Sequence, residues 1–572
     1  MNIKYYLNDK LEKVFNKLGY DTKFANVAFC TTNLADLQCN ASFALAKMLH
    51  KSPIEVADEL IDNMQELTKD FEIANVKGFI NFIIKDSMLS EIANKALKSD
   101  RLNTPKLKNP KTMVIDYGGA NVAKPLHVGH MRSAVIGEAM KKLNIFLGNN
   151  VVSDVHLGDW GLQMGLTIAQ LMDDYDMGYY FGEDKPKIEI TIAMLDDVYP
   201  KASARKKEDQ DFYDRASEIT LLLQQKVKGY YDIWQEMERV SVDMVKTSYT
   251  RLGATFDLWN GESSVNDLVP YVVNLYKEKG LSQESDGATI VEVSKEDETQ
   301  PMPPLLLMKS NGAQMYPVTE IATIVDRMKI YNPDEILYIT DNRQMLHFNQ
   351  VFRACRLAGI VDDSTELKHI TFGTVNGKDG KPFKTRDGGT FKLDDLIDMV
   401  TSKALEKLRA NMVDVPNMQD LSEKIGVGAL IFGDLSNIIS KDYIFDLDKF
   451  MTFEGKTGPY LQYTAVRIKS ILQKSDYVPF DININADTKD IMIKILKLID
   501  SFDIAYREYS LHSIALAVYE LCSSFSNFYN NVKILATEDY EMRQNYLNIC
   551  KLTYNAIELA TNILGIKIPD RM

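Results

Sequence analysis

The sequence has few cysteines, and their arrangement indicates neither a metal site nor a disulfide framework. The five cysteines are spread over 572 residues, form no C-x-x-C pair and do not stand at zinc-binding spacing from histidines. We therefore expect no metal site and no structural zinc. The same scarcity predicts a reducing compartment, the cytoplasm.

Long apolar runs are also missing. No segment approaches the roughly 18 uninterrupted apolar residues that cross a bilayer. The N-terminal segment, MNIKYYLNDKLEKVF, carries charges every few residues and lacks the apolar core of a secretory signal. It has the pattern of an amphipathic helix instead, so we expect no membrane partner.

A surplus of positive charge is absent as well. The 66 lysines and arginines are outnumbered by 80 aspartates and glutamates, which gives a formal net charge of −14. This balance argues mildly against a nucleic-acid partner but does not exclude one, because only the local field at the contact surface matters.

What is present is a chain long enough for about three or four domains. A basic, proline-containing segment ending at Lys111 has the composition of a linker. After it, strand-like residues 113–117, a glycine-containing loop, a helix from near His127 and strand-like residues 151–156 form a βαβ unit, which predicts a Rossmann-like parallel sheet. We expect a small α+β domain over 1–105 with one short strand at 78–84 and an α/β catalytic domain over 106–400 with a helical insertion at about 165–300. Strand-like runs resume at 288–293 and 335–340. A helical connection over 401–454 and an all-α domain over 455–572 are expected to follow.

The most informative motif is His127-Val-Gly-His130 at the start of the crossover helix. Free backbone N–H groups and the positive end of the helix dipole favour phosphate at this position. Residues three apart lie on one helical face, so both imidazoles can donate to one phosphate during displacement at phosphorus. Gly129 leaves room for a nucleotide against the backbone.

The neighbourhood of this motif resembles the class I arginyl-tRNA synthetase family. The signature region is Asp116-Tyr-Gly-Gly-Ala-Asn121-Val-Ala-Lys124-Pro-Leu-His127-Val-Gly-His130, and further blocks are Leu157-Gly-Asp-Trp-Gly161, Leu346-His-Phe-Asn-Gln350 and Phe453-Glu-Gly-Lys-Thr-Gly-Pro-Tyr-Leu-Gln-Tyr-Thr464. The resemblance extends over nearly the whole chain, from Gly78-Phe-Ile-Asn-Phe82 to the C-terminal helices.

The resemblance implies an arginine-binding site, and one of its positions has an independent physical reason. Asp116 lies at the carboxyl end of the first strand of the βαβ unit, where its carboxylate could pair with a guanidinium through two parallel hydrogen bonds. In the family, the remaining arginine-binding positions correspond to Gly119, Asn121, His130, Tyr316, Glu320 and Gln344. Glu320 stands where aspartate is usual, and its extra methylene would carry the carboxylate further from the backbone.

The K-M-S-K motif, which grips ATP phosphates in most class I enzymes, is absent. The corresponding segment from Lys378 to Lys392 holds five basic residues against two aspartates, among three glycines and one proline, which is typical of a phosphate-gripping loop. The resemblance implies that Lys124 compensates for the missing motif. It places His127, His130, Lys124, Lys384 and Arg386 in catalysis, and adds Gly129, His347 and Thr385 at the ATP site.

The implied activity is arginine–tRNA ligation with Mg-ATP, in two steps, by a monomeric cytoplasmic enzyme whose partners are L-arginine, ATP and its tRNA. The family also implies that the N-terminal domain contacts the tRNA elbow, that the C-terminal helices bind the anticodon, and that activation requires bound tRNA. Three alternatives stay open from the residues: another class I synthetase, a nucleotidylyltransferase that uses HxGH, and a synthetase-like RNA-binding protein without catalysis.

Overall fold

The computed structural model describes residues 2–31, 34–295, 297–308, 315–383, 391–410 and 416–572. The chain forms two compact units, one made of Met1–Leu107, Ala404–Ser436 and Asp448–Met572, and one made of Lys108–Lys403 and Asn437–Leu447. Among the described residues, no helix combines the length and the apolar character needed to cross a membrane.

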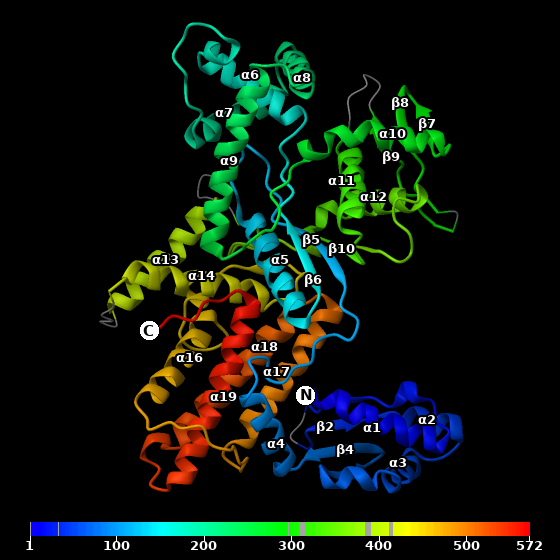
Figure 1. Cartoon of the computed structure of the whole chain (residues 1–572), viewed down its shortest axis with the longest axis vertical. Coiled ribbons are helices and arrows are strands. Elements are labelled where there is room, and N and C mark those ends of the chain that lie inside the picture. Colours follow the sequence, from blue (N-terminus) through cyan, green and yellow to red (C-terminus); the bar gives the residue numbers. More distant parts are fainter. Residues whose placement is uncertain (1, 32–33, 296, 309–314, 384–390, 411–415) are drawn as a thin grey trace. The chain divides into compact units, whose positions relative to one another are not determined.

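A four-stranded parallel sheet is the centre of the second unit, with strand order β11-β10-β5-β6. Its strands are β5 (Thr112–Tyr117), β6 (Asn150–Asp154), β10 (Glu335–Asp341) and β11 (Glu366–Phe372). Helix α5 (Val128–Leu147) joins β5 to β6 (Figure 1). β5 and most of β10 are buried, as expected for parallel strands covered on both faces. The predicted α/β fold with a parallel sheet is therefore confirmed.

The order of the strands places one crevice at the centre of this sheet. The chain runs outward from β5 to β6 in one direction and from β10 to β11 in the other, so β5 and β10 flank the point where the order reverses. Ligands of open α/β sheets bind outside the carboxyl ends of the strands at such a point. The loop that follows β5 carries the histidine motif, and the turn η5 (Asn342–Gln344) that follows β10 leads into α12 (Met345–Leu357).

The segment predicted as a helical insertion divides into two parts. Four helices pack together around a core that contains Trp160 and Trp234, and they appear as a separate group in Figure 1. These helices are α6 (Leu162–Asp174), α7 (Ile192–Arg205), α8 (Gln210–Gln224) and α9 (Tyr230–Leu252), with the short turn η3 (Gly178–Phe181).

The last part of the segment 165–300 is not helical. Strands β7 (Ser282–Ser285) and β8 (Ala288–Val291) pair antiparallel, and β9 (Leu305–Met308) completes a three-stranded sheet. The strand-like run expected at 288–293 corresponds to β8, whereas β7 was not expected. This sheet shares a core with α11 (Tyr316–Tyr331) and α12. The same region includes η4 (Glu262–Leu268) and α10 (Val269–Glu278).

The first unit begins with an antiparallel sheet of order β1-β2-β4-β3, whereas the sequence predicted a single strand there. The predicted strand is β4, and of its partners β2 has three residues and β3 is mostly exposed or half-buried, so neither gives the pattern of a buried strand. The elements are α1 (Ile3–Leu18), η1 (Thr22–Phe24), β1 (Val27–Phe29), β2 (Leu37–Cys39), α2 (Ala41–Leu49), α3 (Pro53–Asp62), η2 (Gln65–Lys69), β3 (Phe71–Val76), β4 (Phe79–Ile84) and α4 (Asp86–Leu97).

Among the remaining residues that the structure describes, the regular elements are helices apart from one strand pair, in agreement with the predicted fold class. The pair is formed by β12 (Val375–Asn376) and β13 (Tyr443–Ile444) in the second unit. From residue 455 onward the described chain contains no strand. The helices are α13 (Leu393–Ala410), α14 (Met418–Leu435), α15 (Leu447–Phe450), α16 (Gly458–Gln473), α17 (Lys489–Glu508), α18 (His512–Asn531) and α19 (Tyr540–Leu564), with η6 (Ile534–Ala536).

Candidate active site

The two histidines of the predicted phosphate site form the N-terminal cap of α5. The His127 Nδ1 atom accepts a hydrogen bond from the Gly129 N–H (3.0 Å), and the His130 Nδ1 atom accepts one from the His127 N–H (3.0 Å). The ring centroids are 4.0 Å apart. A side chain added at Gly129 would place its Cβ 2.9 Å from the His127 ring, so glycine is needed for this arrangement.

The electrostatics of the cap make both rings neutral donors. Burial and the nearby charges of Lys124 and Arg343 lower the pKa of His127 to about 4. Burial, with His127 and Lys124 as further causes, holds the pKa of His130 well below its usual value. Because each Nδ1 accepts a hydrogen bond, the neutral rings carry their protons on Nε2. The helix N-terminus therefore offers two Nε2–H donors to an anion.

The loop between β5 and α5 holds Asn121 against the next block of the sequence. The Val122 N–H donates to the Gly158 carbonyl (3.0 Å), and the Gly158 N–H donates to the Ala120 carbonyl (2.9 Å). A Cβ at Gly158 would stand 2.3 Å from the Asn121 Oδ1 atom. Glycine at 158 therefore leaves the space that the exposed Asn121 side chain occupies.

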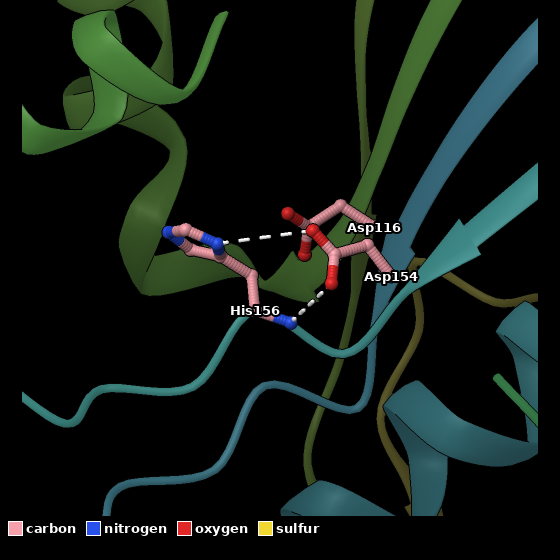
Figure 2. Close-up of side chains that lie close together, drawn as sticks. All are labelled: Asp116, Asp154 and His156. Carbon is pink, nitrogen blue, oxygen red and sulfur yellow. Dashed lines mark hydrogen bonds and ion pairs between the residues drawn. The ribbon is translucent and has the colours of Figure 1, made fainter. Parts of the chain in front are cut away.

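A cluster of Asp116, Asp154 and His156 lies at the carboxyl ends of β5 and β6 (Figure 2). One ligand-type atom from each residue lies within 4.8 Å of the others, so the set has the donors of a metal site. The chain already supplies a cation to it. Arg327 of α11 donates through Nη2 to the Asp116 Oδ2 atom (2.6 Å) and to the Asp154 Oδ2 atom (2.8 Å).

The guanidinium of Arg327 affects both the pKa of Asp116 and the oxygens that Asp116 can present to a ligand. Burial raises the pKa of Asp116, and the charge of Arg327 opposes that effect. For Asp154, burial also favours the neutral form, but the attraction of Arg327 outweighs it and the pKa falls. Asp116 was predicted to grip a substrate guanidinium with both oxygens. One of them is held by Arg327, so a bidentate grip at Asp116 does not fit this arrangement.

A second acidic group lies beside an aromatic pair on α11 and α12. The Tyr316 hydroxyl donates to the Glu320 Oε1 atom (2.7 Å), and the Tyr316 and His347 ring centroids are 4.6 Å apart. Glu320 is only 3% exposed, and its Oε2 atom has no hydrogen-bond partner among the described residues. A buried carboxylate oxygen without a donor is costly, so this atom is suited to a cationic ligand.

Glu262 belongs to the same acidic group, and the sequence did not reveal it. Its backbone N–H donates to the Leu157 carbonyl (3.0 Å). Burial raises its pKa well above the usual value, and the negative charges of Asp159 and Glu320 add to the shift. Glu262 follows a polar segment with no recognisable motif, and its approach to Glu320 depends on the fold alone.

The remaining predicted site residues have separate positions. Gly119 is exposed, and a Cβ there would meet the His156 carbonyl oxygen at 3.3 Å. Gln344 is exposed in the turn after β10. Three others, Lys384, Thr385 and Arg386, lie outside the described residues.

Two of the family-like blocks are held mainly by packing. The Trp234 Nε1–H donates to the Asp159 carbonyl (2.7 Å), which ties the block 157–161 to α9. In the block 453–464, the Gln462 Nε2 atom donates to the carbonyls of Lys424 (2.9 Å) and Lys567 (2.8 Å). In both blocks, these hydrogen bonds join a helix to another segment of the chain.

Three family models match successive parts of the chain. They are the arginyl tRNA synthetase N terminal domain over residues 1–84, the catalytic domain of tRNA synthetases class I (R) over 92–447 and the DALR anticodon binding domain over 461–572. The arginine–tRNA ligase of Agathobacter rectalis is 41% identical over 99% of both chains. That of Francisella tularensis subsp. novicida is 38% identical over 100% of both chains.

Solved structures share the fold. The arginyl-tRNA synthetase of Plasmodium falciparum superposes with a TM-score of 0.84 at 24% identity, covering 100% of this chain and 99% of that one. The Thermus thermophilus enzyme gives 0.82 at 22% identity, covering 100% of both chains. With relatives this similar over their full length and a catalytic-domain model that spans more than half of its residues, this chain belongs to the arginyl-tRNA synthetase family, the class I arginine–tRNA ligases.

Proposed function

We propose that the crevice between β5 and β10 binds L-arginine and Mg-ATP side by side and forms arginyl-adenylate. The observation that carries this proposal is the pairing of two neutral imidazole donors at a helix N-terminus with a buried carboxylate, Glu320, whose Oε2 atom has no donor in the described part of the chain. The first group suits phosphates and the second suits a guanidinium.

The arginine side chain is assigned to Tyr316, Glu320 and Glu262. Asp116 contributes its Oδ1 atom, since Arg327 holds Oδ2. Gly119, Asn121, His130 and Gln344 complete the proposed arginine site around the amino and carboxylate groups. The influence of Glu320 on Asp116, and of Asp116, Glu262 and Glu320 on the pKa of Tyr316, supports a shared neighbourhood for these groups.

The ATP phosphates are assigned to His127, His130 and Lys124, with Gly129 leaving space for the nucleotide. His347 is proposed to complete the ATP site. Lys384, Thr385 and Arg386 are proposed to grip the phosphates from the loop. An oxygen of the arginine carboxylate forms a bond to the α-phosphorus, and the bond from that phosphorus to the β-phosphate bridge breaks, so pyrophosphate leaves.

The second step is transfer to tRNA. The terminal ribose hydroxyl attacks the activated carbonyl, its proton leaves to solvent or phosphate, and AMP departs. The chain needs mainly to position these groups and stabilise their charge. We expect arginine activation to require bound tRNA, so full-rate pyrophosphate exchange without tRNA would contradict this part.

Specificity follows from the acceptors around the guanidinium. Lysine supplies the charge but leaves fork-matching oxygens unpaired, a loss of about 1–3 kcal/mol for each such group. We therefore propose that the enzyme has no editing site and that the segment 165–300 serves structure or tRNA contact. Deacylation of mischarged tRNA by the purified protein would refute this proposal.

For the whole chain, we propose a monomer in the cytoplasm with the domain limits expected from the sequence. Residues 1–105 would contact the tRNA elbow, residues 106–400 would carry catalysis, residues 401–454 would connect, and residues 455–572 would bind the anticodon. Aminoacylation assays with each of the twenty amino acids test the central proposal. Charging of arginine alone is expected, whereas charging of another amino acid or none would favour the other class I or non-catalytic alternatives.

A further inference from the structure

Arg132 is a buried cation two residues beyond His130 on α5, and its side chain is 1% exposed. Residues two apart on a helix point in directions about 200° apart, so Arg132 faces away from the imidazole side. Its Nη1 atom donates to the carbonyls of Gly373 (2.7 Å) and Lys441 (3.3 Å), and its Nη2 atom donates to that of Ile439 (3.2 Å).

Two aromatic rings border the guanidinium. Its central carbon lies 5.6 Å from the Phe372 ring centroid and 5.1 Å from the Tyr443 ring centroid. A buried charge is expensive to desolvate, and an apolar side chain of similar volume would fill the same core more cheaply. The guanidinium instead contributes directional hydrogen bonds, because its planar, rigid set of N–H donors fixes the positions of the carbonyls that it binds.

Those carbonyls belong to two segments that meet beside the β12–β13 pair. The Gly373 N–H donates to the Ile439 carbonyl (3.1 Å), and the Tyr443 N–H donates to the Thr374 carbonyl (3.1 Å). A Cβ at Gly373 would stand 2.5 Å from the Lys441 carbonyl carbon. Glycine is therefore required where the two segments come closest.

A hairpin over residues 375–383, here called the loop base, continues from this junction. The Phe383 N–H donates to the Val375 carbonyl (3.0 Å), and the Gly377 N–H donates to the Lys381 carbonyl (2.8 Å). The hairpin carries Lys378 and Lys381, two of the basic residues of the glycine-containing segment. Lys378 pairs with Asp446 at 3.2 Å, next to β13. Arg132 thus joins the helix that begins with the paired histidines to the loop base.

We infer that Arg132 is a positioning residue for the ATP-dependent step, and this inference rests on the proposed phosphate role of His127 and His130. By fixing the junction at Gly373, Arg132 sets the distance between the imidazole donors and the basic hairpin. Charge stabilisation at a reacting phosphate depends on such placement, because a shift of about 1 Å costs on the order of 100-fold in rate. Arg132 does not itself touch the substrate.

The test uses two variants that alter the same junction from opposite sides. Arg132→Lys keeps the charge but loses the fork, and Gly373→Ala crowds Lys441 while leaving Arg132 in place. Arg356→Lys is the matched control, because Arg356 also donates to main-chain carbonyls, those of Asp362 and Thr365, at the other end of β11. Thermal unfolding of each full-length variant verifies that it folds.

The readout is tRNA-dependent pyrophosphate exchange, with kcat/KM measured separately for ATP and for arginine. At saturating arginine, Arg132→Lys and Gly373→Ala are expected to lower kcat/KM for ATP by about 10- to 100-fold. The arginine dissociation constant, measured by calorimetry with bound tRNA, is expected to stay within about twofold, and the control is expected to match the native enzyme.

Unchanged kcat/KM for ATP in folded Arg132→Lys and Gly373→Ala proteins would overturn the inference, as would an arginine dissociation constant weakened by as much as kcat/KM for ATP falls. A His127→Asn variant distinguishes this failure from failure of the proposed function. If His127→Asn lowers kcat/KM for ATP and the junction variants do not, only the positioning role is wrong. If His127→Asn also leaves kcat/KM for ATP unchanged, the phosphate assignment itself is wrong.

Discussion

Replacing Glu320 with glutamine tests the guanidinium pocket most directly, because the change removes one charge and little volume. The amide oxygen can still accept from the Tyr316 hydroxyl, which lies 2.7 Å from Oε1, so the local structure is expected to persist. What is lost is the negative charge at Oε2, the buried oxygen to which no described residue donates a hydrogen bond.

The size of the effect follows from that lost contact. A hydrogen bond to a charged group contributes about 1.5–3 kcal/mol, and about 1.4 kcal/mol corresponds to a tenfold change. The kcat/KM for arginine in Glu320→Gln is therefore expected to fall by about 10- to 150-fold. The KM for ATP is expected to stay close to the native value, because the histidine cap of α5 does not involve Glu320.

The assay is aminoacylation at varied arginine and at varied ATP, with thermal unfolding as the folding check. Glu284→Gln on the exposed part of β7 is the control for loss of one charge, and it is expected to leave all constants unchanged. Glu320→Asp restores the residue that is commoner in the family and is expected to retain more activity than Glu320→Gln. An arginine kcat/KM within twofold of native in folded Glu320→Gln would refute the assignment of Glu320 to the guanidinium.

Three further changes have expected outcomes. Gly129→Ala brings a Cβ to 2.9 Å from the His127 ring and should displace it, lowering kcat in pyrophosphate exchange by roughly 10-fold or more while the arginine dissociation constant is retained. Gly137→Ala places a Cβ 2.1 Å from Tyr117 and should destabilise the fold by about 1–3 kcal/mol, measured by denaturant unfolding. Because the pKa of Glu262 is raised, acidification should neutralise its carboxylate and lower kcat/KM for arginine. Glu262→Gln should flatten that part of the pH profile of kcat/KM. A Glu262→Gln profile identical to that of the native enzyme would contradict the proposed role of Glu262 in binding arginine.

Local sequence patterns were sufficient to predict the central strands and the crossover helix of the second unit. The predicted helix from His127 is α5, and Gly148 ends it in the left-handed conformation, with φ of 105°. The predicted strands at 113–117 and 335–340 are β5 and β10. Buried parallel strands and a long periodic helix are each recognisable from a continuous stretch of chain.

Short strands could not be predicted in the same way. β1 and β2 have three residues each and exist because they pair with one another and with β4. β11 was also missed, since its residues are only partly buried and alternate little in polarity. Such strands are stabilised by partners distant in sequence, and no window of a few residues contains that information.

The sequence predicted which types of residue form the site, but it did not predict which residues and atoms they contact. The histidine spacing predicts a shared face, but whether Nδ1 or Nε2 points outward depends on the rotamers that cap α5. Asp116 appeared free to bind a ligand because Arg327 lies 211 residues further along the chain. Glu262 was overlooked for the same reason, as its nearness to Glu320 arises only from the folded loop before α10.

The pairing of Arg327 with Asp116 and Asp154 bears on how this pocket distinguishes arginine from lysine. A single nitrogen, Nη2, reaches one oxygen of each carboxylate, which is a point-like contact of the kind that an ammonium could also make. Selection of a guanidinium needs acceptors that match several N–H groups spread over a plane. Within the part of the chain that the structure describes, Glu320 and Glu262 have no partner cation, and the negative charge of Glu320 contributes to the raised pKa of Glu262. Discrimination against lysine therefore falls mainly on these two glutamates, because Arg327 already holds one oxygen of Asp116 and one of Asp154.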